Sequence, residues 1–375
     1  MRIVIDARMY GRFGIGRYNQ NLISNLQKID SKNEYFILHL KKDFESQNYK
    51  KNFHKVLVDV PWYTLKEQVE IPKVLKKINP DLVHFPHFNV PVLYRGKYIV
   101  TIHDLIHQHF HTTRATTHGP LVYKIKKMGY DAAFKSAIKN SQKIITVSNY
   151  VMKSLTDEWR VSKEKIEVTY EGVDRELADL NKKINQEDIK KVLNKFGINP
   201  PFILYVGNAH PHKNVEGLVK AFFSVREKFQ YLQLVLAGGA DEYFWKQIKD
   251  EHPNKNIIYT GSVTDVELAA LYKSASCYTI PSFEEGFGIP LLEAMEFSCP
   301  VVSSNKASLP EVGGNAAVYF NPKNIQDMAD KIESVLKDQT LKKDLISKGK
   351  LRVKDFSWES LAKQTLEVYE NSARS

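Results

Sequence analysis

The chain has 375 residues, of which 43% are hydrophobic and 26% are charged. This composition is typical of a globular protein and the length favours two domains, so collagen-like, disordered and coiled-coil classes are excluded. No apolar run approaches the ~20 residues of a membrane-spanning helix. Arg2, Asp6 and Arg8 interrupt the apolar N-terminal stretch, which argues against a signal peptide. With only two cysteines as well, we expect a cytoplasmic protein.

The formal net charge is +11, and almost all of the excess lies in residues 1–180. One interpretation is an anionic partner, such as nucleic acid, anionic lipid or a phosphorylated substrate. The other is an ordinary solvated, lysine-rich surface. The composition alone leaves both open.

Short runs rich in Val and Ile alternate with amphipathic segments. In chain order, the runs predict strands at residues 3–5, 35–40, 82–85, 98–102, 144–147, 202–206, 233–237, 257–259, 277–280, 301–302 and 317–320. The amphipathic segments predict helices at residues 18–26, 65–78, 121–138, 215–229, 267–274, 291–297 and 358–369. Continuous apolar strands separated by helices indicate an α/β protein whose parallel sheets are covered on both faces.

The polar stretch 176–195 separates two such series of elements, and Pro200 and Pro201 precede the next buried strand. We therefore predict a first domain over residues 1–180 and a second over residues 200–355. The tail 356–375 follows the second domain as a helix without a strand.

Four segments that follow predicted strands could carry chemistry. The first is the loop with Gly11, Gly14 and Gly16, since glycine-rich turns before helices let backbone N–H groups approach a phosphate. The spacing is not a clean dinucleotide fingerprint, so a tight structural turn is the alternative. The second is His103-Asp104, at the end of a strand, where parallel sheets bind ligands.

Three more histidines, His107, His109 and His111, follow His103. Alternating histidines can form a metal site. No matching cysteine or carboxylate pattern accompanies them, so we favour ordinary loop histidines and expect no metal.

The third segment contains Gly207, His210, His212 and Lys213 between a strand and a helix. Lys213 could hold a diphosphate as a point charge, although an exposed lysine at a helix start is also commonplace.

The fourth segment, IPSFEEGFGIPLLEAMEF, is the most informative. Gly286 and Gly288 form a turn before a helix that begins near Pro290, so the backbone N–H groups of Gly286–Ile289 would point at an anion. Glu285 lies in the turn and Glu293 lies one helical turn further on. Two acids beside an anion site suit a ligand with hydroxyls on either side of a diphosphate, although the helix dipole alone also favours acids there.

The spacing from Glu285 to Glu293 resembles the signature of retaining glycosyltransferase family 4, which has the GT-B fold. GIGRY, TIHDLI, ITVSNY, YTGSVTDVELAALY and SLPEVGGNAAVYFNP extend the similarity along almost the whole chain. The subgroup it resembles most comprises bacterial mannosyltransferases of lipopolysaccharide O-antigen assembly. The resemblance implies two Rossmann-like domains that face a central cleft, with a C-terminal helix that crosses back to the N-terminal domain.

The resemblance also implies roles for individual residues. The C-terminal domain would bind a nucleotide-sugar donor, and the N-terminal domain would bind most of a glycan or lipid-linked glycan acceptor. Glu293 would bind the ribose and Glu285 the donor sugar, while His103 would stabilise charge at the anomeric carbon. The diphosphate site would comprise Lys213, Gly207 and the backbone of Gly286, Phe287, Gly288 and Ile289, bordered by Gly14 and Gly16. Val263 would lie near the base.

One departure concerns the arginine that the family often pairs with the lysine. Here the segment reads NAHPHK, and His212 is the candidate substitute. Three alternatives follow: a degenerate GT-B binding protein, a dinucleotide-dependent oxidoreductase, or a nucleic-acid binder. The last two lack their own motifs, so we expect no nucleic-acid partner.

The resemblance implies metal-independent transfer with no cofactor, by a retaining mechanism. GDP-mannose is the favoured donor, with UDP-glucose and dTDP-rhamnose as alternatives. Segment 121–140 carries five lysines, at positions 124, 126, 127, 135 and 139. Because basic amphipathic helices bind anionic membranes, we expect possible peripheral contact at the inner face of the plasma membrane.

Overall fold

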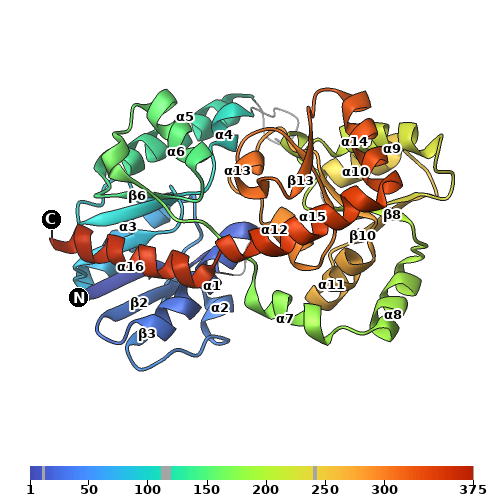
Figure 1. The fold of residues 1–375 in the computed structure, drawn as a ribbon. Helices are drawn as coiled ribbons and strands as arrows, with labels where there is room; N and C mark the ends of the chain where they lie inside the picture. The colour runs from blue at the N-terminus through green and yellow to red at the C-terminus, as the bar shows by residue number, and fades with distance from the viewer. Residues whose placement is uncertain (11–12, 111–119, 240–242, 375) are drawn as a thin grey trace. The chain divides into compact units, whose positions relative to one another are not determined.

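The computed structural model describes residues 1–10, 13–110, 120–239 and 243–374. The chain divides into two compact units, each built around its own parallel sheet (Figure 1). The first unit comprises Met1–Leu105, Thr116–Glu171 and Ser357–Ser375. The second comprises Ile106–Ala115 and Gly172–Phe356. The predicted α/β class, with two Rossmann-like domains, is confirmed.

The first unit has a seven-stranded parallel sheet in the order β3-β2-β1-β4-β5-β6-β7. Its strands are β1 (Arg2–Asp6), β2 (Glu34–His39), β3 (Phe53–Leu57), β4 (Leu82–Phe85), β5 (Tyr98–Ile102), β6 (Ile144–Thr146) and β7 (Ile166–Val168). Its helices are α1 (Phe13–Ile29), α2 (Lys41–Phe44), α3 (Leu65–Ile78), α5 (Pro120–Asn140), α6 (Asn149–Trp159) and α16 (Trp358–Arg374). The central strands β4 and β5 are buried at every position, which explains why they are continuous apolar runs.

The second unit has a six-stranded parallel sheet in the order β10-β9-β8-β11-β12-β13. Its strands are β8 (Phe202–Val206), β9 (Gln233–Ala237), β10 (Ile257–Gly261), β11 (Cys277–Ile280), β12 (Val301–Ser304) and β13 (Ala317–Phe320). Its helices are α4 (Ile106–His109), α7 (Arg175–Lys183), α8 (Gln186–Phe196), α9 (Val215–Arg226), α10 (Tyr243–Glu251), α11 (Asp265–Ser274), α12 (Ile289–Glu296), α13 (Leu309–Gly313), α14 (Ile325–Lys337) and α15 (Gln339–Arg352). All six of its strands overlap predicted runs.

The polar stretch 176–195, which the sequence favours as a connection, instead forms α7 and most of α8. Asp174 and Asn185 accept hydrogen bonds from the first backbone N–H groups of these two helices. Leu177, Ile189 and Val192 are buried, and both helices pack against α11. The unit boundary therefore falls between Glu171 and Gly172, ahead of the expected 180–200 interval.

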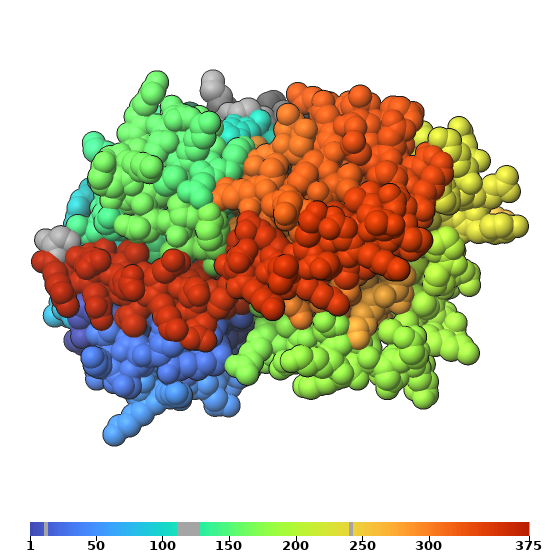
Figure 2. All heavy atoms as spheres, viewed as in Figure 1, coloured from blue at the N-terminus to red at the C-terminus, as the bar shows by residue number. Residues whose placement is uncertain are grey.

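Helix α16 belongs to the first unit, as expected for a C-terminal helix that returns to the N-terminal domain. It packs against α1, and its polar face forms part of the surface in Figure 2. The Tyr369 hydroxyl lies 2.7 Å from Nδ1 of His84, and Nε2 of His84 lies 2.8 Å from the Thr101 hydroxyl. The fully buried His84 thus connects α16 to β4 and β5.

We expect His84 to make the first unit sensitive to acid. Burial lowers the pKa of His84 to about 3, from an ordinary value of 6.5. As pH falls below 6.5, the unfolded chain takes up a proton that the folded unit does not, so stability falls until the pH reaches the folded pKa. At pH 5 the loss is about 2 kcal/mol. Urea unfolding from pH 8 to pH 5 should show a shallower pH dependence for His84→Asn than for the wild type; identical slopes would contradict this assignment.

No helix in the described part of the chain combines the length and apolarity needed to cross a membrane. For the expected membrane-binding segment, the side chains at positions 124, 126 and 127 lie outside the described residues, whereas Lys135 and Lys139 are exposed on α5. Membrane contact therefore stays a prediction.

Candidate functional site

In open parallel sheets, ligands bind beyond the carboxyl ends of strands at the point where the strand order reverses. The order reverses between β1 and β4 in the first unit and between β8 and β11 in the second. Most of the predicted site residues follow these strands or the neighbouring β5. We therefore describe the site in each unit separately.

In the second unit, Lys213 and Glu285 form an ion pair. Lys213 ends a 3₁₀ turn (Pro211–Lys213) that follows β8, and Glu285 lies in the loop that follows β11. The Lys213 ammonium donates to both Glu285 carboxylate oxygens, at 2.8 and 2.7 Å, and the Ser282 hydroxyl donates to one of them at 2.6 Å. The cation expected at a diphosphate thus already contacts the acid expected at a sugar.

Further hydrogen bonds hold these two loops together. The Phe283 N–H donates to the His212 carbonyl at 2.8 Å, and the Asn214 amide donates to the Pro281 carbonyl at 3.1 Å. The buried Ser308 hydroxyl lies 2.9 Å from the carbonyl oxygens of both Glu285 and Phe287. The loop backbone is therefore fixed before any ligand binds, which lowers the entropy cost of binding.

The glycine turn lies directly after Glu285. Gly288 has a φ of 99° and precedes α12, and a Cβ at this position would lie 2.8 Å from the Leu309 side chain. Both the backbone conformation and the space therefore require glycine here. Gly286 and Phe287 are buried, and Ile289 begins the helix, half-buried. The arrangement places the start of α12 beside the Lys213–Glu285 pair in the chain fold, as an anion site requires.

Glu293 is buried within α12, with 1% of its surface exposed. Its carboxylate accepts a hydrogen bond of 3.0 Å from the Tyr272 hydroxyl on α11. The structure therefore adds Tyr272 as a positioning residue for Glu293. Tyr272 lies within the YTGSVTDVELAALY segment of the resemblance, but no local pattern distinguishes it from an ordinary core tyrosine. Val263 precedes α11 and is half-buried.

The histidines near Lys213 contribute little positive charge. The rings of His210 and His212 stack with centroids 5.9 Å apart. Burial, together with the Lys213 charge, lowers the pKa of His212 to about 3. At neutral pH His212 is therefore uncharged, and it cannot replace an arginine as a cation.

The alternating histidines include one close polar pair. His109, on α4, has its Nδ1 2.8 Å from the buried Glu284 carboxylate; His111 lies outside the described residues. Within the described ranges, the grouping with metal-ligand spacing is instead Glu216, Glu251 and His252, whose two carboxylates are exposed. The considered histidine metal site thus has no support among the described side chains.

Gly207 follows β8, and its N–H donates to the Ala237 carbonyl at 3.0 Å. In the first unit, Gly16 packs closely: an added Cβ would lie 2.6 Å from the Tyr10 carbonyl oxygen. Nothing lies within 4 Å of a Cβ added at Gly14, so packing does not explain that glycine. Gly11 lies outside the described residues.

His103 follows β5 in the first unit. Its Nε2 lies 2.9 Å from the Pro86 carbonyl oxygen, so Nε2 carries a proton and donates. Its Nδ1 lies 3.5 Å from the Glu171 carboxylate, and Tyr18 packs edge-on against the ring at 4.8 Å. Glu171, which the sequence gives no reason to select, therefore helps to fix the ring orientation.

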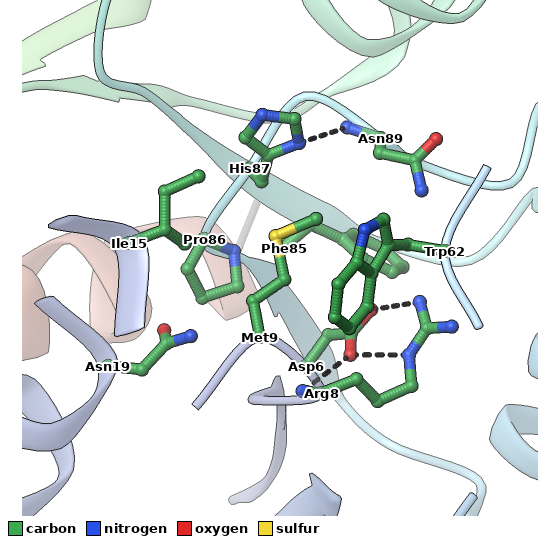
Figure 3. Close-up of a pocket in the computed structure, with 10 residues that line it drawn as sticks. All are labelled: Asp6, Arg8, Met9, Ile15, Asn19, Trp62, Phe85, Pro86, His87 and Asn89. Atoms are coloured by element: carbon green, nitrogen blue, oxygen red, sulfur yellow. Dashed lines mark hydrogen bonds and ion pairs between the residues drawn. The ribbon is translucent and has the colours of Figure 1, made fainter. Parts of the chain in front are cut away.

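A buried ionic network lies at the carboxyl end of β1. The Arg8 guanidinium contacts Asp6 at 2.6 Å and Glu67 at 2.5 Å, and it donates to the Val60 carbonyl at 2.9 Å. The Asn89 amide donates to both Glu67 oxygens. The side chains of Arg8 and Glu67 are 3% and 0% exposed. Figure 3 shows Asp6 and Arg8 in contact at the edge of a small pocket.

Two doubly wound parallel units, followed by a helix that returns to the first, make the GT-B architecture. Comparison with known protein families agrees with it. Residues 14–177 match the model for Glycosyltransferase Family 4, and residues 185–352 match the model for Glycosyl transferases group 1. The chain belongs to this glycosyltransferase family, and the sequence resemblance is confirmed.

The O-antigen chain mannosyltransferase B of Escherichia coli is 34% identical over 172 residues, which cover 45% of this chain and 45% of that protein. The serotype-specific mannosyltransferase WbdA of E. coli is 27% identical over 300 residues, which cover 76% of this chain and 34% of that protein. The match thus spans less than half the length of either relative. The crystal structure of HepE from Anabaena with UDP and glucose has a TM-score of 0.74 at 16% identity, covering 99% of each chain, which shows a shared fold.

Proposed function

We propose that the protein transfers a hexose from a nucleotide diphosphate sugar to a saccharide or lipid-linked saccharide acceptor. The observation that carries the proposal is the second unit's switch point, where Lys213, Glu285 and the glycine turn adjoin the buried Glu293. Lys213 and the start of α12 supply positive potential for a diphosphate. The two carboxylates supply acceptors for hydroxyl groups on either side of it.

We further propose that transfer proceeds with retention and without a metal. As the bond from the anomeric carbon to the donor phosphate breaks, negative charge grows on the leaving diphosphate, where Lys213 and the α12 N-terminus stabilise it. The acceptor hydroxyl forms the new bond on the same face, and its proton passes to the departing phosphate oxygen. His103 stabilises the positive charge at the anomeric carbon.

GDP-mannose is the favoured donor, since the relatives named above are mannosyltransferases of O-antigen synthesis. HepE, crystallised with UDP and glucose, supports a UDP-sugar as the alternative donor. A thermal-shift screen of GDP-mannose, UDP-glucose and dTDP-rhamnose tests this choice, because the bound donor raises the melting temperature. Donor hydrolysis without acceptor separates a working enzyme from a degenerate binding protein.

Replacing each acid by glutamine tests the proposed division of roles. Glu293→Gln should lower nucleoside diphosphate affinity roughly 10- to 150-fold, because hydrogen bonds to a charged group contribute about 1.5–3 kcal/mol. Glu285→Gln should leave this affinity within about threefold or raise it, because it releases Lys213 from a carboxylate; its loss should appear in turnover.

Calorimetry with GDP and UDP measures both affinities. Tyr272→Phe is the matched control, because it removes the hydrogen bond to Glu293 and keeps the carboxylate charge. It should weaken nucleotide binding less than Glu293→Gln does. Equal losses for Glu285→Gln and Glu293→Gln would show that the acids do not divide the donor as proposed.

A further inference from the structure

A small pocket opens in the first unit at its own switch point, beyond the ends of β1 and β4. Its walls come from the loop after β1, helix α1, the loop before α3 and the loop after β4 (Figure 3). The lining residues are Asp6, Arg8, Met9, Ile15, Asn19, Trp62, Phe85, Pro86, His87 and Asn89. The cavity measures about 20 Å³, which is room for one water-sized group.

Asn19 is the one fully buried side chain of this pocket with uncommitted polar atoms among the lining residues that the structure describes. It is 0% exposed, and neither its amide nitrogen nor its amide oxygen has a hydrogen-bond partner. Asp6 and Arg8 bond to each other, and the Asn89 amide bonds to Glu67. Figure 3 shows the Asn19 amide directed toward the middle of the pocket. Because buried amides are normally hydrogen-bonded, this one is arranged for an occupant.

The dimensions and chemistry of the pocket restrict that occupant. One group must both donate to the Asn19 oxygen and accept from its nitrogen, which a hydroxyl does. The walls beside it, Met9, Ile15 and Pro86, are apolar and suit a methylene carbon. A hydroxyl attached directly to a sugar ring would bring ring atoms into a space sized for one group. A hydroxymethyl group, which projects from the ring on a single bond, can enter alone.

We propose that Asn19 binds the hydroxymethyl group of an acceptor hexose and thereby determines acceptor specificity. The inference rests on the proposed function, because it takes the ligand of this unit to be a saccharide. The Trp62 side chain, half-buried at the same pocket, provides an apolar surface for the sugar ring.

The test compares two probes, methyl α-D-mannopyranoside and its 6-deoxy analogue, by ligand-observed NMR on the full chain. The wild type should bind the first about tenfold more tightly, because the deoxy sugar leaves the Asn19 amide unpaired. Asn19→Leu, close in size, should remove this preference and leave the melting temperature unchanged or higher. Asn25→Leu, on the same helix, is the matched control and should keep the preference.

Equal affinity of the wild type for both probes, or no binding of either at 100 mM (roughly the weakest affinity expected for a single sugar), overturns the inference. So does an Asn19→Leu variant that melts lower and keeps the preference, because Asn19 would then hold only a structural water. GDP and UDP titrations on the same samples separate the two levels. Nucleotide binding without sugar preference rejects the Asn19 assignment alone, whereas loss of both rejects the proposed function.

Discussion

Replacing Arg8 by methionine should lower the free energy of unfolding of the first unit by about 3–5 kcal/mol. Arg8 is the cation between Asp6 and Glu67, and both of its ion pairs are almost fully buried. Without it, two carboxylates would lie together in a medium that solvates charge poorly. Burial already raises the pKa of Glu67, even with Arg8 and Asn89 bonded to it. Urea unfolding of the full chain, followed by circular dichroism, measures the loss.

Two further variants separate this network from a general effect of losing an arginine. The double variant Arg8→Met with Glu67→Gln removes one negative charge together with the positive one, so it should recover part of the stability that the single variant loses. Arg95→Met changes an arginine whose hydrogen bonds go to exposed backbone carbonyls, and it should shift stability by about 0.5 kcal/mol or less. An Arg8→Met loss as small as that of Arg95→Met would contradict the argument.

The sequence predicts the interior of both sheets well, because strands covered on both faces must be apolar throughout. It misses β3 and β7, the two edge strands of the first sheet. β3 has one buried residue among five, and β7 has three residues, so neither forms a continuous apolar run. The helices α7 and α8 are missed because only a few of their residues are buried. Their capping residues Asp174 and Asn185 were the readable signals.

The candidate site divides in a similar way. Lys213, Glu285 and Glu293 can be selected from the sequence, since each stands in a strand–turn–helix segment whose geometry favours anion binding. Their partners cannot. The Lys213–Glu285 pair joins residues 72 positions apart, and only the folded second unit brings them together. Tyr272 and Asn19 are ordinary helical residues by any local criterion, and their roles depend on burial and on which polar atoms stay without partners.

Lys213→Met should lower nucleoside diphosphate affinity roughly 100- to 1,000-fold, which corresponds to about 3–4 kcal/mol. Lys213 is the single described cation of the switch-point loops, since burial keeps His212 neutral. The substitution removes this cation and leaves Glu285, whose side chain is 9% exposed, as an unpaired charge beside the diphosphate. Both changes oppose anion binding. Calorimetry with GDP and UDP measures the affinity, and thermal unfolding reports on the second unit.

The ion pair allows binding to be separated from stability in one further variant. Lys213→Met with Glu285→Gln removes both charges, so it should recover the melting temperature that Lys213→Met loses, because no unpaired carboxylate remains. It should not recover most of the nucleotide affinity, because no cation faces the diphosphate. Lys220→Met, which changes an exposed lysine on α9 paired with Glu216, is the matched control and should alter affinity less than about twofold. If the double variant binds nucleotide as tightly as the wild type, Lys213 serves only to neutralise Glu285 and the diphosphate is held elsewhere.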